Sequence, residues 1–457
     1  MGIRLDWEIE AEQAQVRNAG EDPAAARRRR LARIRLVIFI LFVLVVIGAV
    51  VGGIRLRLDM IDGEIERALR NTVEAEVTAL RLGDWQAFAE SQRSASGDWL
   101  ARQEQTFNAY QDLKLQDRVQ LTGTIRDITI DKTRARVAVE EIIEGIPYVR
   151  IWFYWRYDDG WRHVPPDYTF WGDIATRKGA HVTVRYRAVD SSLAAALSSQ
   201  LDQWLETGCA VFACVSPPEL TVDILPDEGL KVSWAASAPW LLQFPSPYVT
   251  RARSDMPFDL GLQLETANLL AERLVAEASN NMQPTYPADA YYLRQAVLSW
   301  LVGQFIEHNT NAFIIDSLAQ RYGQVAVGQL ARAMQPGSDV QILSEVTGGG
   351  TLDQLNLDWR DYLTWRVVLE DQLIRQRDQD NFWRLYDTRD EQVLSLMSAR
   401  FDSLPGEENK VVVSSVQEVG ADGSPQLRAV MQVGSGAGAI QAEVLFRLVG
   451  NVWLRAN

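Results

Sequence analysis

Residues 36–54 read Leu36-Val-Ile-Phe-Ile-Leu-Phe-Val-Leu-Val-Val-Ile-Gly-Ala-Val-Val-Gly-Gly-Ile54 and contain no charged side chain. As a helix rising about 1.5 Å per residue, this stretch measures about 28 Å, close to the thickness of a bilayer's hydrocarbon core. A buried core helix of this length would have a polar face, and a cleaved signal peptide would have a shorter leader and a small-residue cleavage site. The sequence therefore predicts one uncleaved transmembrane helix over residues 36–54.

The charges that flank this stretch are unequal. Six arginines precede it within residues 27–35, whereas only Arg55 and Arg57 follow it closely. Because basic flanks stay on the cytoplasmic side, residues 1–35 are expected to be a cytoplasmic tail and the rest of the chain extracytoplasmic. The arginines can also contact anionic lipid headgroups. The expected location is the cell membrane, as a single-pass protein, with the lipid bilayer as one partner.

The composition limits the chemistry of the exported part. The chain has 457 residues, with 46 Lys and Arg against 60 Asp and Glu, so its formal charge is −14. This acidic balance argues against a nucleic-acid partner, and the length favours about three domains. The chain has three histidines and two cysteines. A site that needs several imidazoles or thiolates therefore has few residues to use.

The two cysteines, Cys209 and Cys214, lie close together in the sequence. An exported domain can hold a disulfide, and a bridge at this spacing would stabilise the fold by roughly 2 kcal/mol. A metal site would need two more ligands, and no second cysteine pair or neighbouring histidine supplies them. We expect a disulfide, with free thiols as the alternative.

Residues 58–172 change from a helical period to a strand period. Apolar residues recur at four-residue spacing from Ile61 to Val77, whereas alternation and β-branched residues follow Asp117. The hairpin Trp155-Arg-Tyr-Asp-Asp-Gly-Trp-Arg162 closes the segment. This pattern resembles the nuclear-transport-factor-two-like cone, a cystatin-like α+β fold.

Residues 370–457 repeat this plan. The segment from Leu373 to Phe401 is expected to be helical, and three strands follow it. The last hairpin, Phe446-Arg-Leu-Val-Gly-Asn-Val-Trp-Leu-Arg455, is similar to the hairpin of the first segment. We expect a second cone-like α+β domain, with chance similarity between two hairpins as the alternative.

The middle segment, residues 178–368, has strands first and helices afterwards, which indicates a two-lobed α+β domain with a groove. Its helical half contains Leu318-Ala-Gln-Arg-Tyr-Gly323, Val327-Gly-Gln-Leu-Ala-Arg-Ala-Met334, Gly348-Gly-Gly-Thr-Leu-Asp-Gln-Leu355 and Trp359-Arg-Asp-Tyr-Leu363. This series resembles the peptidase-MA-like family of gluzincin, thermolysin-like metallopeptidases. Active members have His-Glu-x-x-His on the first long helix and a third zinc ligand, a glutamate, in a Trp-Leu-x-Glu-Gly stretch.

The residues that would bind zinc in this family are absent. The long helix is expected to begin after the N-cap Asp259, and the motif positions on it fall on Glu272, Arg273 and Ala276. The stretch Trp300-Leu-Val-Gly-Gln304 places Gly303 where the third ligand would be. The resemblance thus implies an inactive peptidase-like domain with no metal and no cofactor.

Two other histidines are candidates for chemistry. His163 lies on the last strand of the first cone-like segment, where such folds can house an acid or base, although a structural histidine is the plainer interpretation. The pair Glu307-His308 is a candidate for a weak metal contact, but adjacent helical residues point in different directions, so a solvated helix end is the plainer interpretation.

Together these observations predict an α+β multidomain membrane protein of a bacterial type that is not an enzyme. Its peptidase-like groove, near Leu274, Trp300 and His308, would bind a peptide or an envelope protein without cutting it. Two alternatives stay open. One is a metallopeptidase or other hydrolase with a rearranged site, and the other is a structural spacer in an envelope complex.

Overall fold

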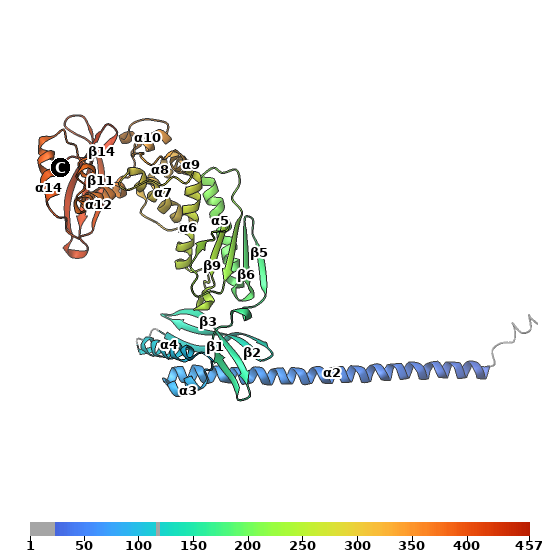
Figure 1. Cartoon of the computed structure of the whole chain (residues 1–457). Coiled ribbons are helices and arrows are strands. Elements are labelled where there is room, and N and C mark those ends of the chain that lie inside the picture. The colour runs from blue at the N-terminus through green and yellow to red at the C-terminus, as the bar shows by residue number, and fades with distance from the viewer. Residues whose placement is uncertain (1–22, 116–118) are drawn as a thin grey trace, which may run out of the picture. The chain divides into compact units, whose positions relative to one another are not determined.

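The computed structural model of the chain describes residues 23–115 and 119–457 (Figure 1). Residues 1–22 of the predicted cytoplasmic tail lie outside the described residues. The described chain mixes helices and strands, and it divides into two compact units. Unit 1 comprises the chain up to Gln116 together with Ile128–Arg136 and Phe153–Pro165. Unit 2 comprises Asp117–Asp127, Val137–Trp152 and Pro166–Asn457.

Helix α2 (Pro23–Leu82) contains the apolar stretch and continues beyond it without a break (Figure 1). Side chains along the stretch are exposed, for example Phe39 at 63% and Phe42 at 63%. Within the described part of the chain, α2 is the one helix that is long and apolar enough to cross a membrane. Towards its end, α2 instead buries Leu69 and Val73 in the core of unit 1.

Two helices and four strands follow α2, in the order that the sequence predicts. They are α3 (Trp85–Glu90), α4 (Gly97–Leu115), β1 (Val119–Asp131), β2 (Arg134–Ile143), β3 (Ile146–Tyr157) and β4 (Gly160–Val164). The strands form a sheet in the order β1-β2-β3, and both β4 and the short β10 (Ala252–Arg253) pair with β3. Strands β3 and β4 form an antiparallel hairpin that turns at Asp158-Asp159, as expected.

The second sheet belongs to unit 2 and has parallel strands in its centre. Its members are β5 (Ile174–Lys178), β6 (Val182–Arg187), β7 (Leu220–Leu225), β9 (Leu241–Pro245) and β8 (Ser233–Trp234), in that order. Strands β6, β7 and β9 run parallel, whereas β5 and β8 are antiparallel edge strands. Helix α5 (Ser191–Val211) connects β6 to β7 and buries Leu197, Leu201 and Trp204.

A run of helices follows this sheet and shares one hydrophobic core with it. The helices are α6 (Leu260–Ala278), α7 (Asp289–Ile306), α8 (Phe313–Tyr322), α9 (Gln324–Ala333), α10 (Ile342–Val346), α11 (Leu352–Leu355) and α12 (Arg360–Gln376). The N-cap predicted for α6 is confirmed, because Asp259 accepts a hydrogen bond from the backbone of Leu262. Short 3-10 turns lie at Tyr168–Phe170, Ala188–Asp190, Pro247–Val249 and Gly436–Gly438.

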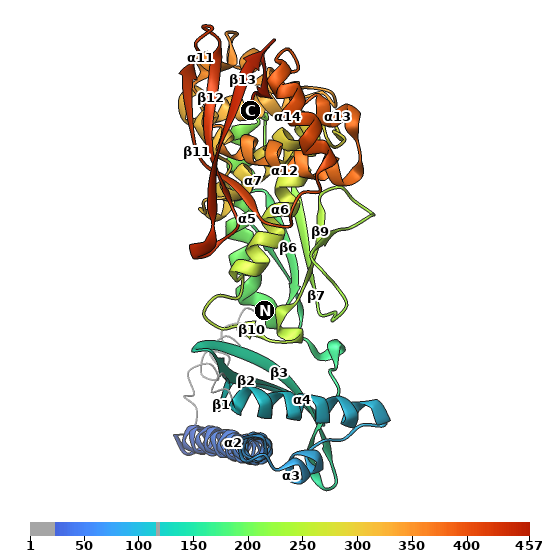
Figure 2. The same ribbon diagram turned by 90° about the vertical axis from the view of Figure 1, so that its left-hand side faces the viewer.

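The C-terminal part contains α13 (Gln379–Trp383), α14 (Glu391–Asp402) and an antiparallel sheet of β11 (Lys410–Val419), β12 (Pro425–Val433), β13 (Ile440–Val449) and β14 (Val452–Arg455). Figure 2 shows β11 as an outer strand of this sheet. The expectation of continuous helix from Leu373 to Phe401 is wrong. Helix α12 ends because Arg377 adopts a left-handed conformation with φ 57°, and Asp378 then caps α13.

Candidate functional site

The positions that match the peptidase motif make structural contacts on α6. Glu272 Oε1 lies 2.6 Å from the guanidinium of Arg294 on α7. The side chain of Arg294 is 4% exposed, whereas that of Glu272 is 49% exposed. A cation that is nearly buried needs a partner, so Glu272 acts as the counterion of Arg294.

The next residue, Arg273, and the helix end contact the sheet edge. The Arg273 guanidinium lies 4.6 Å from the ring centroid of Trp234 on edge strand β8. Trp240, which precedes β9, donates its indole N–H to Glu277 Oε1 at 2.9 Å. Because both contacts hold the strand edge against α6, the face that includes Arg273 and Ala276 is used for packing.

Gly303 on α7 has no space for a glutamate. A Cβ at this position would lie 2.7 Å from the backbone oxygen of His308 and 3.1 Å from Thr310 Oγ1. The glycine therefore permits the loop after α7 to fold back closely onto the helix. Throughout residues 23–115 and 119–457, no three His, Cys, Asp or Glu side chains gather as metal ligands.

Trp300 and His308 line one hollow of about 320 Å³ together with mostly polar side chains. The other lining residues are Gly303, Gln304, Glu307, Asn309, Thr310, Asp316 and Gln320. Leu274 is absent from this lining because it is buried at 7% exposure and packs closely against Gly208 on α5. The structure thus brings together two of the three residues expected in the groove and places Leu274 in the core.

The hollow has a carboxyl group of altered acidity and a loop of unusual conformation. Burial raises the pKa of Asp316, and a hydrogen bond from the Trp300 indole opposes part of this effect. In the loop, Glu307 and Asn311 have left-handed φ values of 51° and 56°. Such angles are costly for residues with a Cβ, so packing must hold this loop in place.

His163 belongs to a polar cluster in unit 1 that the sequence did not reveal. Glu76 on α2 lies 2.6 Å from His163 Nδ1 and accepts hydrogen bonds from Tyr154 at 2.8 Å and Gln92 at 2.8 Å. The side chain of Glu76 is fully buried. The backbone of His163 also pairs with residues 91 and 93, so β4 holds the segment after α3.

This Glu76 cluster, formed by Glu76, Gln92, Tyr154 and His163, is closed to substrate. Tyr154 is 0% and His163 7% exposed, and Trp99 packs edge-on against the imidazole with ring centroids 5.6 Å apart. Burial and the charge of Glu76 raise the pKa of Tyr154 well above its ordinary value, so the phenol stays a donor. A buried carboxylate with several donors is a structural anchor between helix and sheet.

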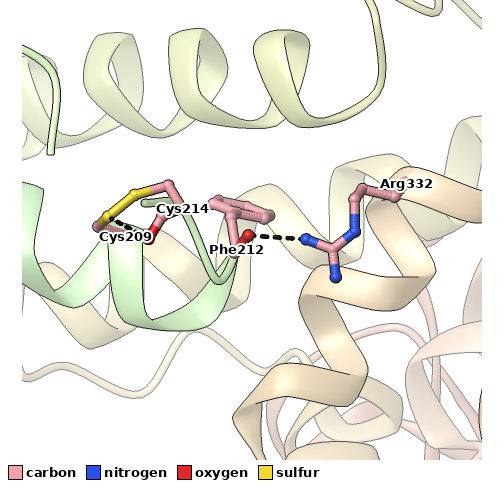
Figure 3. Close-up of a disulfide and its surroundings, with 4 residues drawn as sticks. All are labelled: Cys209, Phe212, Cys214 and Arg332. Carbon is pink, nitrogen blue, oxygen red and sulfur yellow. Dashed lines mark hydrogen bonds between the residues drawn. A yellow bond between two sulfur atoms is a disulfide. The ribbon is translucent and has the colours of Figure 1, made fainter. Parts of the chain in front are cut away.

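Cys209 and Cys214 form a disulfide at the end of α5 (Figure 3). Beside it, Arg332 on α9 donates to the backbone oxygen of Phe212 at 2.7 Å. Gly328 allows this approach, since a Cβ there would lie 2.1 Å from the Val211 oxygen. The bridge and the arginine together hold the end of α5 against α9.

A network of buried charges surrounds α12. Glu370 is 2% exposed and pairs with Arg400 at 3.0 Å and with Arg455. Burial alone would raise the pKa of Glu370, but these two guanidinium groups hold it below its ordinary value. Asp371 pairs with Arg400 and Lys410. These ion pairs join α12 to α14, β11 and β14.

No protein-family model and no curated protein matches this chain.

Proposed function

We propose that the protein is a membrane-anchored, extracytoplasmic binding or scaffolding module whose peptidase-like domain does not hydrolyse its ligand. One observation carries this proposal. Each of three positions where the resemblance calls for zinc chemistry has another use: Glu272 neutralises Arg294, Arg273 stacks on Trp234, and Gly303 admits the His308 loop. A zinc site needs ligands with free lone pairs directed at one point.

The membrane part of the proposal is supported by α2. Its apolar stretch has no protein partner in the described part of the chain, as a lipid-facing helix requires. The arginine excess before the stretch favours an N-terminus in the cytoplasm. The disulfide of Cys209 and Cys214 agrees with an oxidising compartment for unit 2.

The binding part is supported by the hollow near Trp300. Its amides, Thr310 hydroxyl and carboxylates offer both donors and acceptors beside an indole, which suits the polar backbone of a peptide segment. We place the bound segment at this hollow, with His308 and Asn309 on its rim.

Metal analysis and a proteolysis assay test the non-hydrolytic character. The purified full chain in detergent should contain zinc only at background level and should leave an unfolded protein substrate intact. Stoichiometric zinc that is lost in Glu272→Gln or His308→Ala would overturn the proposal and establish the alternative of a rearranged metallopeptidase.

Cross-linking in intact membranes tests binding. A photo-reactive residue at position 309 should capture an extracytoplasmic protein, and His308→Ala should reduce the capture. Capture that is unaffected by His308→Ala would favour the spacer alternative. The buried ion pairs of Glu370 and Asp371 favour that alternative, because they hold α12 rigidly to the C-terminal sheet.

A further inference from the structure

Strand β11 has one unpaired edge, because the sheet order is β11-β12-β13-β14 (Figure 2). It is ten residues long, and Val411, Val413 and Val416 are 41%, 39% and 60% exposed. A long edge strand with apolar side chains is a template for another strand unless something blocks it. One N–H of this edge is already hydrogen-bonded to a side chain outside the sheet: the backbone N–H of Val412 donates to Thr364 Oγ1 on α12 at 2.9 Å.

A recess of about 360 Å³ lies along β11 from Val413 to Gln417. Its other walls come from α8, from the loop before α12, from the first residue of α12 and from β12, through Ser317, Arg321, Asp358, Arg360 and Leu427. Every one of these residues belongs to unit 2. The recess is separate from the hollow near Trp300, because the two sets of lining residues have no member in common.

The side chain of Gln417, a residue that lines the recess, contains one acceptor that lacks a donor. The Gln417 side-chain N–H donates to the backbone oxygen of Asp353 at 2.6 Å. Since a carbonyl can only accept, this bond fixes which amide atom is nitrogen and leaves Oε1 on the other side. Gln417 Oε1 is buried and has no hydrogen-bond partner. A buried acceptor without a donor is costly, and an N–H group of a ligand in the recess would remove this cost if the Gln417 side chain turns towards it.

The recess also contains one cation without a counterion. Arg360 is neutralised by Asp358 at 2.6 Å. Arg321, at the end of α8, is exposed and forms no ion pair within the described residues. The recess therefore offers a free guanidinium, a group that binds a carboxylate through paired hydrogen bonds.

From these features we infer that the β11 edge binds an extended peptide that carries a carboxylate. The peptide would add a strand beside Val413–Gln417, donate an N–H to Gln417 Oε1 and place its carboxylate against Arg321. The carboxylate is that of an aspartate, a glutamate or a C-terminal residue. This β11 edge site is independent of the proposed function, because it uses none of the positions that match the zinc site (Glu272, Arg273, Ala276 and Gly303) and none of the residues that line the hollow near Trp300.

Pooled peptides test the site. Fluorescent nine-residue random pools are titrated against the full chain in detergent, with anisotropy as the readout. One pool has acidic side chains and an amidated end, a second has a free C-terminus without acidic side chains, and a third has neither. At least one acid-containing pool should bind at least tenfold more tightly than the third pool. The pool that binds identifies the source of the carboxylate.

Variants assign the binding to the recess. Arg321→Gln should weaken it at least tenfold and Gln417→Leu severalfold, whereas Arg384→Gln, an exposed arginine outside the recess, should not change it. His308→Ala should also bind normally. Thermal unfolding of each variant checks the fold. Absence of binding by every pool, or binding that Arg321→Gln leaves unchanged, would overturn the inference.

Backbone methylation tests the strand geometry. In a peptide enriched from the bound pool, N-methylation should abolish binding at alternate residues, because successive N–H groups of a strand point to opposite sides. Sensitivity without this two-residue period would contradict strand addition.

Discussion

Glu272 on α6 and Glu76 on α2 are carboxylates in different units, and a sequence motif points to only the first of them. Glu272 matches the position of a zinc ligand, yet its side chain is 49% exposed and pairs with one arginine. Glu76 matches no motif, yet its side chain is fully buried and has three partners. The contrast teaches that a family pattern locates a region, whereas burial and partners decide what a carboxylate does there.

Removal of the Glu76 carboxylate should lower the stability of the fold more than any other substitution considered below. Glu76→Ala leaves the donors of Tyr154 and Gln92 without their acceptor in a buried site, so we expect the free energy of unfolding to fall by about 3–5 kcal/mol. Urea titration followed by tryptophan fluorescence measures this loss. The control is Glu74→Ala, an exposed residue of the same helix, which should change stability little. If the two variants lose equal stability, Glu76 does not anchor the helix to the sheet.

A glutamate placed at Gly303 tests whether this fold has space for a third zinc ligand. Gly303→Glu should lower the free energy of unfolding by about 3 kcal/mol, because its Cβ would meet the His308 oxygen. Gly337→Glu, at a glycine with open space around it, serves as the control. A Gly303→Glu variant as stable as that control would mean that the loop yields readily, and a third ligand would then be sterically allowed.

Some of this organisation could be predicted from local sequence. The apolar stretch of α2, the Asp259 cap and the turn at Asp158-Asp159 depend on neighbouring residues, and the structure has each of them. The break after α12, in contrast, is marked by neither Gly nor Pro in the sequence. The residue in the left-handed conformation there is Arg377, which local sequence does not predict.

The Glu76 cluster and the β11 edge site could not be predicted in this way. Tyr154 and His163 are 78 and 87 residues from Glu76 along the chain, so only the fold brings their side chains together. Arg321 and Gln417 are likewise distant in sequence and meet at one recess. Periodicity predicts elements, but it does not identify which faces of distant elements meet.

A third carboxyl group, that of Asp361, should make the stability of the fold depend on pH. Burial raises the pKa of Asp361 to about 6, although N–H groups of Tyr362 and Ile314 donate to it. The folded state therefore holds a proton that the unfolded chain releases near its ordinary value of 3.8. This contribution is full at pH values below the ordinary pKa and is lost as pH rises through about 6, with a total amplitude of about 3 kcal/mol.

Asp361→Asn tests this dependence because it removes the titration and keeps one acceptor oxygen. The difference in unfolding free energy between wild type and variant should change by about 2 kcal/mol between pH 4 and pH 7, in the direction that disfavours the wild type at pH 7. Asp380→Asn, at an exposed site, should show no such trend. A constant difference for Asp361→Asn would place its pKa at the ordinary value.

The smallest effect expected is a gain in stability at Glu307, the residue that ends α7. Its φ of 51° is costly for a residue with a Cβ and free for glycine, which commonly ends helices in this conformation. Glu307→Gly should therefore raise the free energy of unfolding by about 1 kcal/mol, whereas Glu307→Ala, which removes the charge and keeps the Cβ, should not. If both variants gain equally, the side-chain charge of Glu307 and not its backbone is the source of the cost.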